Sequence, residues 1–454
     1  MGEKREFAVL RPLPLYHIVI ERASNAIIAG GRFFLDYSFA CRFLDDLPPS
    51  SYGLEVVKAL IEHMRLQLSK LKVIHIAGTN GKGSVSAMTR SALIECGYKT
   101  GSFNSPCVFD RREGICIDDY PVDERAYVDA FAQAYAVMDA VEAQCGRKPT
   151  AFETETAMAL CLFIREGCDF AVIEAGLGGR DDATNVVQDT LVAAFTSISL
   201  DHTAILGDSL YDIASNKAGI IKEGCSVVTA PQEQTAHNVL KCAAGSFGAD
   251  IRVCEAGKIL RADIDGQLIS IGGEDYFIPL IGAFQAVNLA VSVGILDTLR
   301  GRGYSLPQEK IKSGLSHTKW RGRMQIIGRR PLFILDGAHN PAAAQALADS
   351  IDCYIGGRVT LLMGVFKDKD YMSELGILLN KAEHIVTFDW DNPRALGGKE
   401  LYDACGDRID RHYAPDIGDA VRLAIELAGA GGTVVATGSL SHLKYIEEAY
   451  RNIW

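Results

Sequence analysis

The sequence predicts an α/β protein with two domains. Short apolar segments alternate with longer helical patterns, which is typical of parallel β-α-β units. A glycine-rich segment, Ile76–Ser84, lies between a predicted strand and a predicted helix. The alternation stops at 250–280 and starts again near Trp320. Because 454 residues are too many for one ordinary core, we expect two domains, 1–318 with an N-terminal extension, and 319–454.

The first domain is predicted to contain buried strands that end in polar loops. Val73–Ala77 is predicted to be a strand, and Val85–Cys96 a helix that ends at Gly97. Two further strands are predicted at Asp169–Ala175 and Leu191–Ser197. Ligands of an open α/β sheet bind beyond the carboxyl ends of its strands. The loops after these strands are therefore the expected site.

The middle of the chain has a different pattern. Short β-like segments with a turn at Gly272-Gly273 predict a small antiparallel insert at 250–280. Helices and a second series of strands then follow. The helices are predicted at 285–300 and 307–317, and the strands at 324–327, 332–335, 359–363 and 433–436. The first 35 residues carry no motif that predicts a role.

Composition and charge exclude several classes of protein. The formal net charge of -11 argues against a general nucleic-acid or anionic-membrane binder. The twelve cysteines include no CxxC pair, so neither a zinc cluster nor a disulfide framework is predicted. No apolar run approaches the roughly 18 residues needed to cross a bilayer, and no signal peptide is evident. We expect a cytoplasmic protein with small-molecule substrates.

The strongest local signal is IAGTNGKGS, Ile76–Ser84. Backbone N–H groups of a glycine-rich loop and of the following helix can surround a phosphate chain, with Lys82 as the cation for the β- and γ-phosphates. Ser84 can supply an oxygen to Mg²⁺. The spacing departs from GxxxxGK[ST], since Gly83 separates Lys82 from Ser84. The alternative is a strand-to-helix turn that binds nothing.

Two more polar segments follow predicted strands. In IEAGLGGRDDATN, Ile173–Asn185, Glu174 stands at a strand end, where it can hold a divalent cation. Asp182 can instead be a residue that stabilises a turn. Asp201 and His202 follow the next strand. If both strands are parallel, these side chains share one edge of the sheet with Glu174, which favours a functional site there.

The last two motifs lie in the predicted second domain: WRGRMQ, Trp320–Gln325, and LDGAHNP, Leu335–Pro341. Arg323 offers a bidentate fork for phosphate, and Asp336 ends a strand where it can reach a nucleotide or a metal. The alternatives are a domain linker and a strand-to-helix loop. The residues alone do not decide between them.

With all five motifs in this order, the chain resembles the folylpolyglutamate synthase and dihydrofolate synthase group of the Mur ligase family. The resemblance extends from about Gly53 to the C-terminus and rests on GTNGKGS, GLGGRxDATN, LDHTxxLG and LDGAHNP. Gln285, Asn288 and three further segments also match, at 364–370, 392–396 and 438–440. It implies an N-terminal P-loop ATPase domain of Mur-ligase type and a C-terminal Rossmann-like glutamate-ligase domain, with the active site between them.

The resemblance also implies roles for single residues. Lys82, His202 and Lys217 would be catalytic, and Lys217 would be carried as a carbamate. The residues implied to bind ATP are Thr79, Asn80, Gly81, Lys82, Gly83, Ser84, Asn288, Arg323 and Asp336. The implied Mg²⁺ ligands, for two ions, are Ser105, Glu174 and His202. The residues implied to contact the pterin-bearing substrate are Thr150, Phe152, Glu153, Asp181, Asp182 and Ala183.

The implied activity is ATP-dependent addition of L-glutamate to the glutamyl carboxylate of a reduced folate through an acyl phosphate, with dihydropteroate as a second acceptor. A monomer is expected. One alternative is a Mur-type ligase for a non-folate carboxylate, and another is a catalytically silent nucleotide-binding protein. The metal and ATP positions argue against the silent protein, since all of them are present.

Four segments depart from the family pattern. Cys107 and Val108 replace the usual residues after Ser-Pro, Gly114 replaces an arginine, Asp181 replaces an apolar residue, and Phe284 replaces a histidine. Three of these four changes lie on the expected acceptor side. The changes at Asp181, Cys107 and Gly114 lead us to expect that reduced folate is a better acceptor than dihydropteroate. Desolvating an unpaired carboxylate at Asp181 is costly, and Gly114 lacks a side chain that could anchor the substrate.

Overall fold

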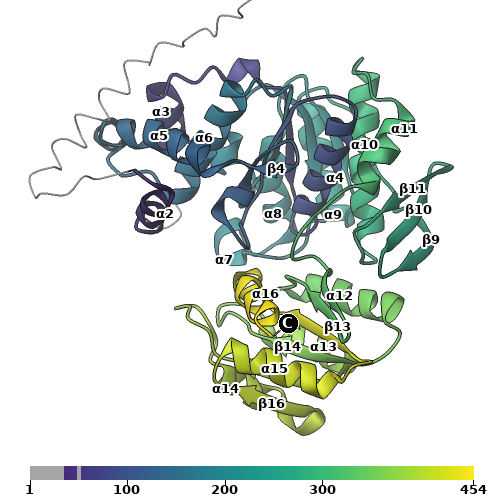
Figure 1. Ribbon diagram of the computed structural model, residues 1–454. Coiled ribbons are helices and arrows are strands. Elements are labelled where there is room, and N and C mark those ends of the chain that lie inside the picture. Colours follow the sequence, from purple (N-terminus) through teal and green to yellow (C-terminus); the bar gives the residue numbers. More distant parts are fainter. Residues whose placement is uncertain (1–34, 49–52, 454) are drawn as a thin grey trace, which may run out of the picture.

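The computed structural model describes residues 35–48 and 53–453, which form two α/β domains that lie one above the other (Figure 1). The N-terminal extension expected from the sequence lies outside the described residues, apart from Leu35. The chain passes to the second domain between α11 (Gln308–Ser316) and β12 (Gln325–Arg329). None of the described helices is long and apolar enough to cross a membrane. The predicted α/β class with parallel sheets is confirmed.

The first domain is organised around an eight-stranded sheet with the order β4-β3-β2-β5-β1-β6-β7-β8. Its strands are β1 (Val73–Ala77), β2 (Thr100–Phe103), β3 (Ile115–Ile117), β4 (Tyr120–Pro121), β5 (Phe170–Glu174), β6 (Thr190–Phe195), β7 (Ser226–Thr229) and β8 (Ile251–Val253). β1 pairs in parallel with β5 and β6, whereas β3 and β4 add an antiparallel edge. The central strands β1 and β5 are buried along their whole length because helices cover both faces of the sheet.

Helices cover this sheet in two layers. The helices are α2 (Tyr37–Asp45), α3 (Glu55–His63), α4 (Lys82–Glu95), α5 (Glu124–Cys145), α6 (Ala151–Arg165), α7 (Thr203–Leu206), α8 (Leu210–Lys217), α9 (Gln234–Ser246), α10 (Gln285–Gly301) and α11. Alternate residues of β1 serve the two layers. Ile74 and Ile76 join the core with α4, α10 and α11, whereas Val73 joins the core with α3, α5 and α6.

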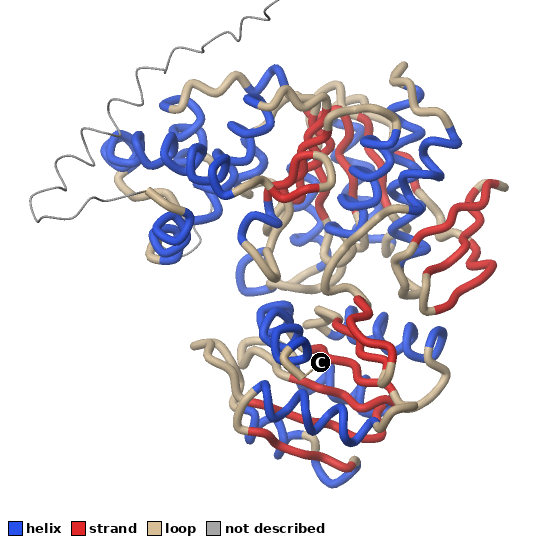
Figure 2. Tube along the Cα trace, viewed as in Figure 1, coloured by secondary structure: helices blue, strands red, loops and turns tan. Residues whose placement is uncertain are grey.

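The predicted antiparallel insert is present as a three-stranded sheet beside α10 and α11 (Figure 2). It consists of β9 (Lys258–Asp263), β10 (Gly266–Ile271) and β11 (Glu274–Ile278). Gly272 and Gly273 connect β10 to β11, and both have positive φ angles, 61° and 88°, which suit a tight hairpin turn. The insert begins later than predicted, because β8 pairs with β7 and belongs to the main sheet.

The second domain has a six-stranded sheet with the order β12-β13-β17-β14-β15-β16, parallel except for β12. Its other strands are β13 (Leu332–Leu335), β14 (Val359–Met363), β15 (Ala382–Phe388), β16 (Asp410–Ala414) and β17 (Thr433–Thr437). α12 (Pro341–Tyr354), α13 (Tyr371–Leu378) and α14 (Gly398–Ala404) cover one face, and α15 (Ile417–Ala428) and α16 (Leu443–Arg451) cover the other. β15 and β16 were not predicted from the sequence.

Candidate active site

The predicted site residues meet at the boundary between the two domains, where loops from both sheets face each other (Figure 2). A cavity of about 420 Å³ lies there. Its walls are formed by the loops that follow β1, β5 and β6, by α10, and by the segment that follows β13. As expected for open α/β sheets, the carboxyl ends of parallel strands supply the walls.

The loop after β1 is shaped for close approach of a ligand to the backbone. Gly78 and Gly81 have positive φ angles, 150° and 92°, and Gly81 directly precedes α4. A side chain at Gly81 would collide with the amide of Asn288. Helix α4 begins at Lys82, one turn earlier than predicted, so its free N–H groups open toward the cavity. This arrangement favours a bound anion.

Three charged side chains lie together beside this loop: Glu174 and Lys217, which are buried, and Lys82, which is partly buried. The Lys82 Nζ lies 3.8 Å from Glu174 Oε1 and donates to the carbonyl oxygens of Gly78 and Thr79 at 3.2 and 3.3 Å. The Lys217 Nζ donates to the same Gly78 oxygen at 2.8 Å. Two lysine side chains therefore share one backbone acceptor, with a single carboxylate next to them.

Burial strongly shifts the pKa values of Glu174 and Lys217. Burial raises the pKa of Glu174 to about 7, and the nearby Lys82 and Arg323 oppose the shift. Burial lowers the pKa of Lys217 to about 7, and the charge of Lys82 lowers it further. Both groups therefore change charge near neutral pH. Strong shifts from burial and a specific charged partner are typical of functional sites.

Three of the cavity residues fit a divalent cation. Glu174 is a buried carboxylate, and Ser105 and His202 line the same cavity. Burial lowers the pKa of His202, so its imidazole is neutral at pH 7 and can act as a ligand. His202 also has a left-handed backbone, with a φ of 50°, which is uncommon outside glycine and recurs at functional sites. A carboxylate, a hydroxyl and a neutral imidazole together suit Mg²⁺ or Mn²⁺.

Asp336 and Arg323 also line the cavity. Asp336 stabilises the local structure through hydrogen bonds to the backbone. Its carboxylate accepts hydrogen bonds from the N–H groups of Met324 and Ala338, both at 2.9 Å. Asp336 thus ties the loop after β13 to the start of the domain and places Arg323 at the cavity. Burial raises the pKa of Asp336, and Arg323 opposes the shift.

Two amide side chains of helix α10 connect it to the start of α4, after the loop that follows β1. The Gln285 Nε2 donates to the hydroxyl of Ser84 at 3.3 Å, and the Asn288 Nδ2 donates to Gln285 Oε1 at 3.0 Å. Ser84, Gln285 and Asn288 are buried. This chain of hydrogen bonds holds the first turn of α4 in place. Gly83 is pressed against the ring of Trp320, so the loop also contacts the start of the second domain.

A second cavity, of about 490 Å³, adjoins the first and shares Ser105 and His202 with it. All six residues expected to contact the pterin-bearing substrate line this cavity: Thr150, Phe152, Glu153, Asp181, Asp182 and Ala183. Phe152 stacks on Phe103 with ring centroids 5.6 Å apart. Phe152 lines the cavity and presents an apolar ring to it, with the buried Phe103 packed behind.

Several polar groups of this second cavity already have partners. Thr150 and Glu153 form the capping box of α6, and Arg147 donates to both oxygens of Glu153 at 2.9 and 2.6 Å. Asp182 accepts from the N–H groups of Leu177 and Thr184 at 2.7 and 3.1 Å. The turn-stabilising role that the sequence left open for Asp182 is therefore present in the structure.

The hydrogen bonds that join the two domains here were not predicted from the sequence. Asp201 accepts from Lys369 Nζ at 3.3 Å and from Asn340 Nδ2 at 3.2 Å. Asn340 also accepts from Asn80 Nδ2 at 3.3 Å. Lys369 and Arg394 extend from the second domain into the second cavity. The available signal was that Lys369 and Arg394 lie in two segments, 364–370 and 392–396, that match the family pattern.

Comparison with protein families locates two domains along the chain. Residues 125–296 match the Mur ligase middle domain, and residues 322–440 match the Mur ligase glutamate ligase domain. These matched ranges fall in the first and second domains of the structure, and the cavities lie between the two domains.

Individual relatives are similar over most of the chain. The dihydrofolate synthase/folylpolyglutamate synthase of Bacillus subtilis is 32% identical over 407 residues, which is 87% of this chain and 94% of the relative. The folylpolyglutamate synthase of Lacticaseibacillus casei is 32% identical over 66% of this chain and 72% of its own.

Solved structures of folylpolyglutamate synthases are similar to this structure over most of the chain. The Mycobacterium tuberculosis folylpolyglutamate synthase complexed with ADP superposes with a TM-score of 0.83 at 28% identity, covering 92% of this chain and 98% of that one. The Escherichia coli FolC complex with DHPP and ADP gives 0.79 at 27% identity with the same coverage. The Yersinia pestis bifunctional enzyme complexed with AMPPNP and Mn ion gives 0.79 at 29% identity, again with the same coverage. The chain therefore belongs to the folylpolyglutamate synthase/dihydrofolate synthase family of the Mur ligases.

Proposed function

We propose that this protein is an ATP-dependent ligase that adds L-glutamate to the glutamyl carboxylate of a reduced folate through an acyl phosphate, with dihydropteroate as a second acceptor. One observation carries the proposal: the loop before Lys82 opens into a cavity that adjoins a second cavity lined by all six residues expected to bind the pterin-bearing substrate. ATP and the acceptor carboxylate can therefore meet near Ser105 and His202, which line both cavities.

The first half of the reaction activates the acceptor. A carboxylate is a poor electrophile, so its oxygen first attacks the γ-phosphate and ADP leaves. Lys82 and the free N–H groups at the start of α4 bind the phosphate chain and neutralise charge that develops during transfer. Ser105, Glu174 and His202 would hold Mg²⁺, which supplies further neutralisation of the phosphates when bound.

The second half forms the amide. The amine of glutamate attacks the acyl carbon, and phosphate leaves from the tetrahedral intermediate. Because water also hydrolyses an acyl phosphate, the domains need to close over it. The contacts of Asp201 with Lys369 and Asn340 link the domains at this point. Lys369 and Arg394 face the second cavity as cations that suit the carboxylates of glutamate.

We also propose that Lys217 is carbamylated. The neutral amine attacks CO₂, a proton is released, and the cation becomes an anion. Two observations support this step. The lowered pKa, about 7, supplies neutral amine near pH 7. A carbamate nitrogen keeps one N–H, so the hydrogen bond to the Gly78 oxygen can be retained. An anion here would also relieve the repulsion between Lys217 and Lys82. Intact-mass measurement at neutral pH under CO₂ should show one added CO₂ that Lys217→Met lacks.

Four further expectations belong to this proposal: two Mg²⁺ ions per site, a monomer, a cytoplasmic location, and domain units 1–318 and 319–454.

The deciding experiment for the activity incubates purified protein with ATP, Mg²⁺ and each of the twenty amino acids, in the presence of a reduced folate or dihydropteroate. Products are identified by mass. We expect ADP, phosphate and a glutamylated folate. A product with another amino acid would favour a different Mur-type ligase, and ATP binding without any product would favour the catalytically silent protein.

A further inference from the structure

Three side chains with metal-ligating atoms lie together in the C-terminal domain, away from both cavities. His384 is on β15, and Asp410 and His412 are on the neighbouring strand β16. The strands are parallel, with His384 opposite Asp410 in the register. Because successive side chains of a strand point to opposite faces, His412, two residues after Asp410, projects from the same face. All three side chains therefore share one face of the sheet.

The ligand atoms are close to the spacing of a metal site. The His384 Nδ1 lies 2.8 Å from Asp410 Oδ2, and the His412 Nε2 lies 3.2 Å from the same oxygen. All three atoms lie within 4.8 Å of one another. In a tetrahedral site with bonds of about 2.0–2.2 Å, ligand atoms are separated by roughly 3.3–3.6 Å. Small rotations of these side chains would be enough to surround an ion.

The hydrogen bonds of the cluster leave one nitrogen without a partner. The His412 Nε2 is buried, and within residues 35–48 and 53–453 no group forms a hydrogen bond of acceptable geometry with it. Its 3.2 Å approach to Asp410 is therefore an electrostatic contact with poor alignment. A cation between the rings would accept the lone pairs of both histidines.

We propose that His384, Asp410 and His412 form a binding site for a divalent transition-metal cation of the Zn²⁺ class. Two imidazoles and one carboxylate suit Zn²⁺, whereas Mg²⁺ and Ca²⁺ prefer oxygen ligands alone. The side chains of His384, Asp410 and His412 are 21%, 57% and 30% exposed, so an ion can enter and water can complete its coordination. Bound metal would fasten β16, the edge strand of the sheet, to β15.

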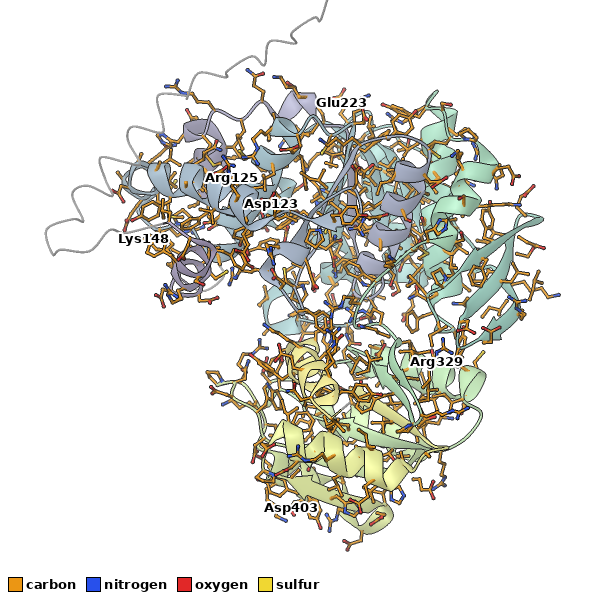
Figure 3. All side chains as sticks on the ribbon, in the orientation of Figure 1. Asp123, Arg125, Lys148, Glu223, Arg329 and Asp403 are labelled. Carbon is orange, nitrogen blue, oxygen red and sulfur yellow. The ribbon has the colours of Figure 1, made fainter. Side chains whose placement is uncertain are left out.

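This site is separate from the proposed ligase site. His384 and Asp410 lie near the amino ends of their strands, whereas the cavities lie at the carboxyl ends. Figure 1 places β16 at the end of the second domain that is remote from the first, and Figure 3 shows Asp403, on the adjacent α14, at that same end. Loss of the metal here is therefore not expected to abolish binding of ATP or folate.

The test is a calorimetric titration of the whole, tag-free protein with Zn²⁺. The protein is first stripped with EDTA and then saturated with ADP and Mg²⁺, so that the nucleotide site is already filled. We expect one Zn²⁺ per chain. Loss of an outer-sphere partner already weakens metal binding about 10–100-fold, so Asp410→Asn and His412→Gln should each weaken it at least tenfold. The matched control is His237→Gln, which changes a histidine on α9 and should bind Zn²⁺ like the wild type.

Thermal unfolding without Zn²⁺ checks that each variant is folded. If His412→Gln does not fold, Asp410→Asn decides the result, because its side chain faces solvent and keeps its shape. A crystal measured at the zinc edge should show an anomalous peak among the three side chains. The proposal is overturned if the wild type binds no Zn²⁺ under these conditions, or if it binds equally well after substitution of Asp410 and His412.

Discussion

The two neighbouring cavities differ in how their charged groups are satisfied. On the side proposed to bind phosphate, Glu174 and Lys82 are 3.8 Å apart, Lys217 shares an acceptor with Lys82, and burial shifts the pKa values of Glu174 and Lys217 to about 7. On the side proposed to bind the acceptor, Glu153 and Asp182 accept hydrogen bonds from an arginine and from backbone N–H groups. The phosphate side therefore holds groups poised for a ligand, whereas the carboxylates Glu153 and Asp182 of the acceptor side are held by bonds within the protein.

The comparison predicts that substitutions on the phosphate side have the largest effects on turnover. Lys82→Ala should reduce turnover by about two to four orders of magnitude, equivalent to roughly 3–5 kcal/mol of barrier, because a charge that neutralises the transferring phosphoryl group is lost. The measurement is steady-state glutamate incorporation at saturating ATP. Lys241→Ala, on the exposed surface of α9, is the matched control. Near-normal turnover of Lys82→Ala would refute the role given to this loop.

The second prediction concerns the requirement for Mg²⁺. Glu174→Gln keeps the shape of the side chain but removes an anionic ligand, so the Mg²⁺ concentration that gives half-maximal activity should rise by at least about tenfold. His202→Ala should shift it in the same direction. Glu153→Gln, on the acceptor side, should leave it unchanged. If neither Glu174→Gln nor His202→Ala alters the Mg²⁺ dependence, these residues do not hold the metal.

The third prediction uses the raised pKa of Glu174, about 7 in the folded protein against an ordinary value of 4.5. Between these pH values the folded state binds more protons than the unfolded state, so this group favours folding at low pH and loses that contribution as pH rises toward 7. In the absence of metal and nucleotide, Glu174→Gln should therefore be more stable than the wild type at pH 8 by roughly 1–3 kcal/mol.

Urea unfolding at pH 8 and pH 5 measures this difference. The gap between Glu174→Gln and the wild type should shrink at pH 5, where the wild-type carboxyl is mostly protonated in the folded state. Glu153→Gln is the counterpart on the acceptor side and should be destabilised, because its side chain would lose the charge that pairs with Arg147. A gap of equal size at both pH values would mean that Glu174 is not the cause.

Parts of the fold differ in how far the sequence could predict them. The central strands and the loop before Lys82 were predictable, because buried parallel strands give continuous apolar runs and glycines mark the turn to α4. β16 was missed because Asp410, Arg411 and His412 give an edge strand a polar sequence. The contacts of Asp201 with the second domain were missed because they depend on how two separately folded domains meet.

Some assignments stayed open for a physical reason. Asp182 and Asp336 both line cavities and both bind backbone N–H groups of their own loops. A carboxylate at a strand end has the same sequence pattern in either role. Positions whose side chains are free of such bonds, such as His202 and Lys369, are better candidates for ligand contacts.

The smallest expected effect belongs to the acceptor side. Asp181 lies at the second cavity but is exposed to solvent. The free-energy cost of its charged carboxylate is therefore smaller than in a closed apolar pocket. We still expect reduced folate to exceed dihydropteroate as an acceptor, because the bound pterin would remove part of that solvent. Asp181→Leu should raise the specificity constant for dihydropteroate by only about two- to fivefold, and that for reduced folate by less.

Specificity constants for both acceptors, at saturating ATP and glutamate, test this ranking. Asp189→Leu, another exposed aspartate outside the cavity, is the control. A wild-type preference for dihydropteroate would reverse the ranking, and a change of two or more orders of magnitude in Asp181→Leu would show that this side, too, holds an unsatisfied charge.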